Sequence, residues 1–246
     1  MHEKEMRVLR ELGLRYSPVA VKFVKRAEEM PEWARELVKR RRIRACQMLM
    51  DAKHGESSAI TPENFACPAA ASAFGFAPLP EKISSGEMLC ALGLFMSKEA
   101  GRRTMEVIPR LKEKFHGVIA QPLERAEFKP DVIVIEDIPE VIMWLLLADL
   151  YREGGRHTFS TSVIQACCVD VTSYVFQTKK VNASFGCYGC REASDLRDDE
   201  AMIGIPYERF PEIVEAVRMM KEKGTIERVR RKGVLGVYMK MKQSER

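Results

Sequence analysis

Residues 131–151 read DVIVIEDIPEVIMWLLLADLY, and this stretch decides the fold class. Asp131 to Glu136 is a β-branched apolar run with the length and composition of a strand. Pro139 then begins a strongly apolar helix, because proline is tolerated in the first turn, where its missing N–H would have no partner. Gly154 and Gly155 end that helix after Tyr151. A strand followed directly by a helix indicates an α/β protein.

The same alternation of strands and helices extends to both sides of this stretch. Further strands are predicted at 18–24, 57–60, 117–122, 157–160, 181–185 and 201–205. Helices are predicted at 3–13, from Pro31, and at 45–53, 61–74, 89–115, 162–176, 207–223 and 225–232. We therefore expect an α/β fold, with α+β as the alternative, in which a mixed sheet is flanked by helices.

The chain also resembles itself when it is shifted by 100 positions. Between residues 52 and 90, eight of 39 aligned positions are identical: Gly55/Gly155, Thr61/Thr161, Ala66/Ala166, Cys67/Cys167, Phe76/Phe176, Ser84/Ser184, Gly86/Gly186 and Cys90/Cys190. Chance would give about two or three identities. We predict two diverged copies, at about 15–115 and 116–206, related by a pseudo-two-fold axis, and a basic helical extension at 207–246. A chance match between two helical regions is the alternative.

Composition fits one globular protein over residues 1–246. The chain is 46% hydrophobic and 30% charged, which are ordinary values. The N-terminus has no secretory signal, and the longest apolar run, Val141 to Leu147, is far shorter than the roughly 20 residues that span a bilayer. A cytoplasmic protein without a membrane partner is expected. Seven cysteines cannot all pair within the chain, so metal ligands, reactive thiols or core residues are expected instead.

The net charge of +5 is concentrated in two regions, at residues 39–44 and in the C-terminal segment 221–242. Either region could bind an anion such as phosphate or nucleic acid. Both lie among helix-forming residues, however, and a solvated helix face is the ordinary interpretation of such a run. We therefore do not expect a nucleic-acid partner.

The sharpest local motif is Cys187-Tyr188-Gly189-Cys190, which follows a predicted strand and opens a short helical turn. Such a pair can act as a redox dithiol or supply two ligands to zinc or iron. No second pair of suitable spacing is present. Free cysteine is also among the most buried residue types, so a single cysteine is more often a core residue than a functional one.

Several segments together resemble the DUF169 family, a cysteine-containing archaeal and bacterial domain of unknown function. The matching segments are Pro18–Lys22, Cys46-Gln47, Ala52–Gly55, Ile60–Pro68, Pro130–Val134, Gly186–Gly189 with Arg191, Asp199-Glu200 and Gly204–Pro206. The resemblance covers nearly the whole chain and implies a family pattern without an assigned reaction.

This resemblance implies four matched cysteines, two from each predicted copy: Cys46, Cys67, Cys168 and Cys187. Such a set suits an iron–sulfur cluster or a zinc site between the copies. The family pattern often has serine at the position of Cys190, which favours Cys187 as the ligand. The two indications differ by one residue, because the internal repeat selects Cys167 and the resemblance selects Cys168.

We thus expect a metal-binding protein, with an iron–sulfur cluster as the leading candidate cofactor and zinc as the other, that acts in electron transfer or redox chemistry. Its expected partner is a redox protein or a small molecule, and a homodimer is left open. One alternative is a module that binds an anionic small molecule through Lys22, Arg191 and residues 39–44. Another is a dithiol oxidoreductase that uses Cys187 and Cys190. Lys22 could also simply end a strand and reach solvent.

Overall fold

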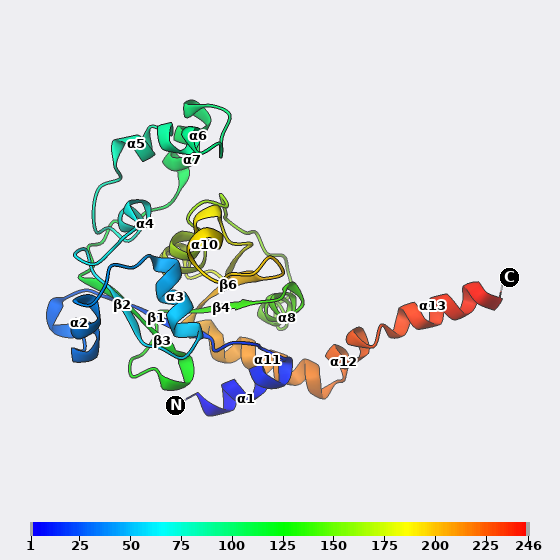
Figure 1. Ribbon diagram of the computed structural model, residues 1–246. Coiled ribbons are helices and arrows are strands. Elements are labelled where there is room, and N and C mark those ends of the chain that lie inside the picture. Colours follow the sequence, from blue (N-terminus) through cyan, green and yellow to red (C-terminus); the bar gives the residue numbers. More distant parts are fainter. Residues whose placement is uncertain (1, 245–246) are drawn as a thin grey trace.

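A single antiparallel sheet, in the order β2-β3-β1-β4-β6-β5, forms the middle layer of the protein in the computed structural model, which describes residues 2–244 (Figure 1). The strands are β1 (Val19–Val24), β2 (Ser58–Ile60), β3 (Gly117–Pro122), β4 (Val132–Asp137), β5 (Asn182–Ser184) and β6 (Ala201–Pro206). β1 and β4 pair at the centre, with Ala20 opposite Ile133. The prediction of a mixed sheet is wrong, since every neighbouring pair is antiparallel. Helices do alternate with strands along the chain. The helical segments that connect the strands, however, never join two strands that are parallel neighbours in the sheet.

Both faces of the sheet are buried, which accounts for the continuous apolar runs of its central strands. Val132 and Val134 of β4 point into one hydrophobic core, whereas Ile133 and Ile135 point into the other. One face packs against α1 (Glu3–Leu12), α2 (Glu32–Val38), α8 (Pro139–Asp149) and α11 (Phe210–Glu222). The opposite face packs against α3 (Ala45–Lys53), α4 (Pro68–Ala73), the π-helix η3 (Ala166–Ser173), α9 (Tyr174–Thr178) and α10 (Tyr188–Ala193).

The remaining elements extend beyond these layers. A cap of three short helices lies above α4 in Figure 1: α5 (Glu81–Ser84), α6 (Glu87–Ala91) and α7 (Lys98–Val107). At the other end, α12 (Thr225–Arg230) and α13 (Gly233–Ser244) lead away from the body. Single 3-10 turns occur at η1 (Ala27–Glu29), η2 (Leu123–Arg125) and η4 (Tyr207–Arg209). Within residues 2–244, no helix is both long enough and apolar enough to cross a bilayer.

Four predicted elements differ from the structure. The helix predicted at 162–176 begins only at Ala166, as the π-helix η3, and continues as α9. Residues 157–160 form no strand, because the Asn182 side chain satisfies both the N–H and the carbonyl of Ser160 at 2.9 and 2.8 Å. The helix predicted from residue 61 begins only at Pro68, since the Asn64 side chain bonds the Thr61 N–H and holds a turn there. The long helix predicted over 89–115 is divided into α6 and α7 by a turn at Gly93, whose φ is +72°.

Candidate functional site

A cavity of about 350 Å³ lies on the face of the sheet that carries α3, α4, η3 and α10. Six of the seven cysteines line it: Cys46, Cys67, Cys167, Cys168, Cys187 and Cys190. All are free thiols. The lining of the cavity is mostly apolar and includes Met88 and Leu89 of the cap. Cys90, which belongs to α6, does not line the cavity.

Helix starts place most of these thiols. Cys46 is the second residue of α3, and Cys67 and Cys187 are the N-cap residues of α4 and α10. Pro68 occupies the first position of α4, which fixes where that helix begins. The four predicted ligands, Cys46, Cys67, Cys168 and Cys187, thus come from four separate elements and all face one cavity. The sequence-based interpretation missed that Cys167 and Cys190 line it as well.

The π-helical geometry of η3 explains why both adjacent cysteines reach the cavity. A π-helix has i→i+5 hydrogen bonds and a wider turn than an α-helix, and such segments are frequent at functional sites. The hydroxyl of Thr172 also donates to the carbonyl of Cys167, five residues earlier. Gln165, just before the helix, has a left-handed backbone with φ of 62°, and its amide donates to the Ala69 carbonyl at 2.7 Å. The disagreement between Cys167 and Cys168 therefore has a structural cause, because both thiols are lining residues.

Cys190 lies at the centre of the closest group of sulfur atoms. Its Sγ is 2.9 Å from Sγ of Cys167 and 3.1 Å from Sγ of Cys187. Sγ of Cys167 also contacts Sδ of Met202 on β6 at 3.9 Å. Two thiolates on one tetrahedral zinc would be about 3.8 Å apart, given Zn–S bonds of about 2.3 Å. Consistent with this, no group of three or more His, Cys, Asp or Glu side chains in the described part of the chain stands in a metal-holding arrangement.

The surroundings of Cys167, Cys168 and Cys187 favour the protonated thiol in the absence of a cation. Burial raises the pKa of Cys168, and a hydrogen bond with Cys190 together with burial raises the pKa values of Cys167 and Cys187. Backbone N–H groups of Ala166 and Cys190 act in the opposite direction on the Cys187 pKa. A thiolate here therefore requires a compensating positive charge, which a metal centre supplies.

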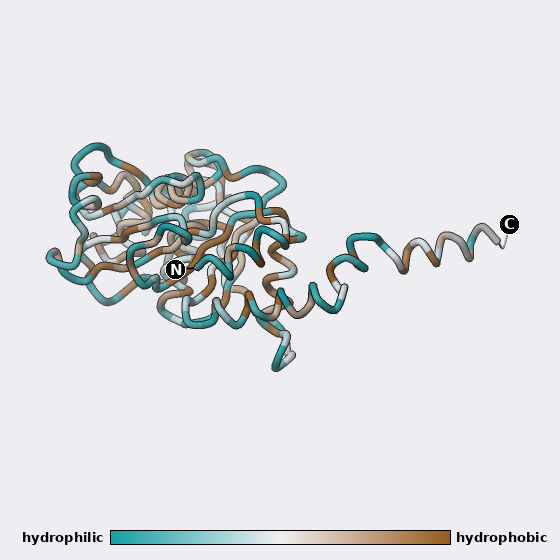
Figure 2. Tube along the Cα trace, turned by 90° about the horizontal axis from the view of Figure 1, so that it is seen from below, coloured by the Kyte–Doolittle hydropathy of each residue, from teal (hydrophilic) through white to brown (hydrophobic). Residues whose placement is uncertain are grey.

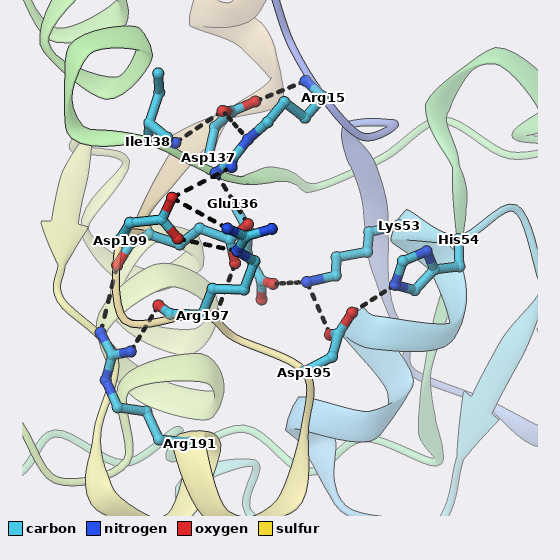
Figure 3. Close-up of polar contacts among 11 residues, drawn as sticks. Arg15, Lys53, His54, Glu136, Asp137, Ile138, Arg191, Asp195, Arg197 and Asp199 are labelled. Atoms are coloured by element: carbon cyan, nitrogen blue, oxygen red, sulfur yellow. Dashed lines mark hydrogen bonds and ion pairs between the residues drawn. The ribbon is translucent and has the colours of Figure 1, made fainter.

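Figure 3 shows a chain of charges that is buried at its Lys53–Glu136 end and partly exposed at Asp195 and His54. Lys53 Nζ is 2.8 Å from Oε2 of Glu136 and 2.8 Å from Oδ1 of Asp195, and the Asp195 carboxylate is also 2.5 Å from Nε2 of His54. The side chains of Lys53 and Glu136 are only 1% and 4% exposed. Burial raises the pKa of Glu136, although the positive charge of Lys53 opposes that shift. Glu136 in turn contributes to the raised pKa of Cys167.

This ion-pair chain was not predicted from the sequence. Two features of the sequence could have indicated it. Glu136 lies near the end of an otherwise apolar strand, and Lys53 lies in the last turn of α3.

Arg191 organises the loop that carries Cys187 rather than the cavity itself. Its guanidinium donates to the Phe185 carbonyl at 2.6 Å. It also donates to the Arg197 carbonyl at 2.7 Å (Figure 3). Lys22 lies elsewhere, on the sheet face opposite the cysteines, with Nζ 3.4 Å from the Lys129 carbonyl. Neither is among the residues that line the cavity. Of the basic run at 39–44, only Arg44 lines it.

Comparisons with known proteins identify relatives of the chain. The model of the family DUF169, described as "Uncharacterised ArCR", matches residues 8–216. A protein of Methanocaldococcus jannaschii, named "Uncharacterized protein MJ0308", is 32% identical over 206 residues, which cover 83% of this chain and 88% of that protein. No solved structure gives a significant match.

Proposed function

Since the chain belongs to the DUF169 family, we propose that the function lies in the cysteine cavity, which holds an iron–sulfur cluster used in electron transfer or redox chemistry. The ligands in this proposal are Cys46, Cys67, Cys168 and Cys187. Four thiolates are the ordinary ligand set of such clusters. The observation that carries the proposal is that six free thiols from four elements line one cavity.

Depth in the cavity supports this choice of four among the six thiols. Cys167 and Cys190 are 2% and 3% exposed and form the innermost group with Met202, whereas Cys46, Cys168 and Cys187 are 5% to 8% exposed and Cys67 is more open still. A cavity of about 350 Å³ is also larger than a single zinc ion needs, which favours a polynuclear centre. When bound, the cluster supplies one-electron chemistry, and the thiols must rotate away from their present close contacts to hold it.

We also propose that the two halves of the sheet descend from a duplicated unit, which places the cavity between the copies. The order β2-β3-β1-β4-β6-β5 reads the same from both edges if β1, β2 and β3 correspond to β4, β5 and β6. The registers agree, since Val19 lies opposite Pro122 and Val132 opposite Pro206. Both β3 and β6 end in a proline, and the chain continues as the 3-10 turns Leu-Glu-Arg and Tyr-Glu-Arg.

This correspondence favours a different pairing of cysteines from the ungapped shift of 100 residues. α3 and η3 both precede the edge strand and begin with Ala-Cys, whereas α4 and α10 both follow it and have cysteine as the N-cap. Cys46 then corresponds to Cys167, the neighbour of the proposed ligand Cys168, and Cys67 corresponds to Cys187. Each copy contributes thiols from two equivalent places, which supports a ligand set drawn equally from both halves.

Anaerobic purification tests the metal proposal directly. We expect brown protein with broad visible absorbance and with both iron and acid-labile sulfide. Cys46→Ser, Cys67→Ser, Cys168→Ser and Cys187→Ser should each remove most of the iron, while Cys90→Ser is the matched control because Cys90 lies outside the cavity. Cys167→Ser should retain iron if Cys168 is the ligand. Folded, colourless and iron-free protein after anaerobic reconstitution would contradict the proposal.

A dithiol oxidoreductase is the second candidate, because Sγ of Cys187 and Sγ of Cys190 are only 3.1 Å apart. The raised pKa of Cys187 weighs against it, since an attacking cysteine must be a thiolate. The Cys190→Ser variant separates the two. It should keep its iron under the cluster proposal, whereas it should lose all disulfide-reducing activity if the pair is catalytic.

A further inference from the structure

The C-terminal arm, α13, follows α12 and is oriented away from the body by a backbone bend at Lys232. Arg230 fixes α12 to the body, because its guanidinium lies 2.8 Å from Glu140 of α8 and 2.6 Å from the Leu12 carbonyl. Lys232 then has a left-handed backbone, with φ of 51°, and α13 continues outward (Figure 1). The arm begins after residue 216, where the family match ends.

The helix α13 exposes an unusually large apolar surface. Val234 is 82% exposed, and Leu235, Val237, Tyr238 and Met239 are about half exposed or more. At 3.6 residues per turn, these five positions cover an arc of about 200° around the helix. Figure 2 shows hydrophobic positions along this arm, outside the body. A helix of 12 residues that contains Gly233 and Gly236 is marginal in water without a packing partner, so this surface requires one.

A complementary surface lies on the body. An apolar groove of about 420 Å³ runs along α8 and is closed on its other side by Phe159 and Phe185. Met143 and Leu147, one turn apart on α8, are exposed in it, as are the two phenylalanine rings. Exposed apolar patches of this kind mark interaction sites in soluble proteins. The chain therefore carries both an apolar helix and an apolar groove. Figure 1 shows α13 extending away from α8 of its own chain.

We propose that α13 of one copy packs into the α8 groove of a second copy, and reciprocally, so that the protein is an arm-exchanged homodimer. Such a contact is isologous, because each copy supplies one helix and one groove. Recognition uses the helix-in-groove mode, in which apolar side chains on successive turns of a helix enter a hydrophobic groove. This inference does not depend on the proposed cluster.

The shape and area of the surfaces favour a second copy over a lipid surface. A helix that lies on a membrane has a strongly polar face opposite a narrower apolar one, whereas the apolar arc of α13 covers more than half of the helix and suits a groove. We treat α13 as a cylinder about 18 Å long and 10 Å wide, of which the apolar arc is buried. Counting the helix and the groove in both reciprocal contacts, the buried area totals about 1,200 Å². That area is at the lower end of the range for specific stable interfaces.

Light scattering coupled to size exclusion tests the proposal. The full chain should have the mass of a dimer. An arm variant, Val237→Asp with Leu235→Asp, and a groove variant, Met143→Asp with Leu147→Asp, should each be folded monomers. Met96→Asp is the matched control, because Met96 is 99% exposed but belongs to neither surface. Mixing the arm variant with the groove variant should restore a dimer with one intact contact, at weaker affinity than the full chain.

Three results would overturn the inference. The first is a full chain that is monomeric at tens of micromolar concentration. The second is a groove variant that stays dimeric, which would place the arms against each other. The third is a monomeric full chain that sediments with phosphatidylcholine vesicles containing anionic lipid and loses this binding in the arm variant. Circular dichroism of each variant establishes that the fold is retained, so that loss of the dimer is assigned to the altered surface.

Discussion

Lys53 and Glu136 form a buried ion pair whose two charges depend on each other. Each side chain is almost fully inaccessible, and Lys53 bonds both Glu136 and Asp195 at 2.8 Å. Removing one member of a buried pair leaves an uncompensated charge, which costs more than the net contribution of the pair itself. The pair fixes the end of α3 against β4, beside the innermost thiols.

The first prediction concerns this pair. Lys53→Met should lower the free energy of unfolding by about 3 to 5 kcal/mol, because Glu136 loses its partner in the interior. The double variant Lys53→Met with Glu136→Leu should recover most of that loss. Urea unfolding measures both, and Lys98→Met is the control, since the exposed Lys98–Glu87 pair should contribute at most about 1 kcal/mol. If the double variant is no more stable than Lys53→Met alone, the loss of stability does not come from the unpaired charge of Glu136.

A second buried carboxyl, Asp170, should make stability depend on pH. Burial raises its pKa from 3.8 to about 6, although hydrogen bonds from Thr161 at 2.6 Å and Ser184 at 2.9 Å oppose the shift. The folded state therefore holds this proton more tightly than the unfolded state. Its contribution to stability is fully present below about pH 4 and is lost as the pH rises through about 6.

The variant Asp170→Asn isolates the pH-dependent contribution of Asp170 to stability, because the side chain of asparagine does not titrate. The free energy of unfolding of the native chain, relative to that of the variant, should fall by about 2 to 3 kcal/mol between pH 4 and pH 7. Denaturant unfolding at several pH values measures the difference, and it cancels the titration of other groups shared by both chains. Parallel pH profiles for the two proteins would show that Asp170 has an ordinary pKa.

At the scale of elements, η3 packs directly on the sheet through a glycine. A Cβ at Gly204 of β6 would lie 2.2 Å from the Val171 carbonyl oxygen, so the backbone of η3 touches the strand there. This close approach positions the π-helix, and hence Cys167 and Cys168, at the inner end of the cavity.

We expect Gly204→Ala to lower the free energy of unfolding by about 1 to 3 kcal/mol, because the π-helix must move away from β6 to admit the methyl group. The shift should also increase the rate at which maleimide labels the cavity thiols in the metal-free protein. Gly236→Ala is the control, since a Cβ there meets nothing within 4 Å. Equal stability and labelling in both variants would argue against tight packing at Gly204.

The sequence predicted those elements whose pattern is local. The central strands β1 and β4 and the helix α8 have long apolar runs with a proline or glycine near the boundary. Their predicted limits agree with the structure to within two residues. The segment at 157–160 has strand-like residues too, but a side chain from residue 182 takes its hydrogen bonds instead. Such long-range competition leaves no local signal.

The candidate site was predicted only in part, for a similar reason. The residue types and the family pattern indicated four cysteines, and these four do line one cavity. The inclusion of Cys167 and Cys190 depends on the π-helical turn of η3 and on the orientation of α10, neither of which the one-dimensional pattern specifies. The partners of Lys53 come from β4 and from the loop after α10, so only the assembled fold brings them together.

At the scale of the whole molecule, the two C-terminal helices differ in how they belong to the fold. Ile226 of α12 is 1% exposed and packs in the core beneath α8 and α11, and Arg230 bonds Glu140 and Leu12. α13 makes few contacts with the rest of its own chain. The boundary between the body and the arm therefore lies between these helices, near Lys232.

Two truncations test that boundary. A chain ending at residue 232 should unfold with the same free energy as the full chain within about 0.5 kcal/mol, when both are measured at a concentration low enough to keep them monomeric. A chain ending at residue 224 should lose about 2 to 5 kcal/mol, because it leaves a cavity where Ile226 packs and removes the Arg230 contacts. Equal loss in both would mean that α13 stabilises its own body. If removal of α13 alone leaves the stability of the monomer unchanged, as we expect, then the apolar surface of α13 does not stabilise its own chain. It is then assigned to contacts with another molecule.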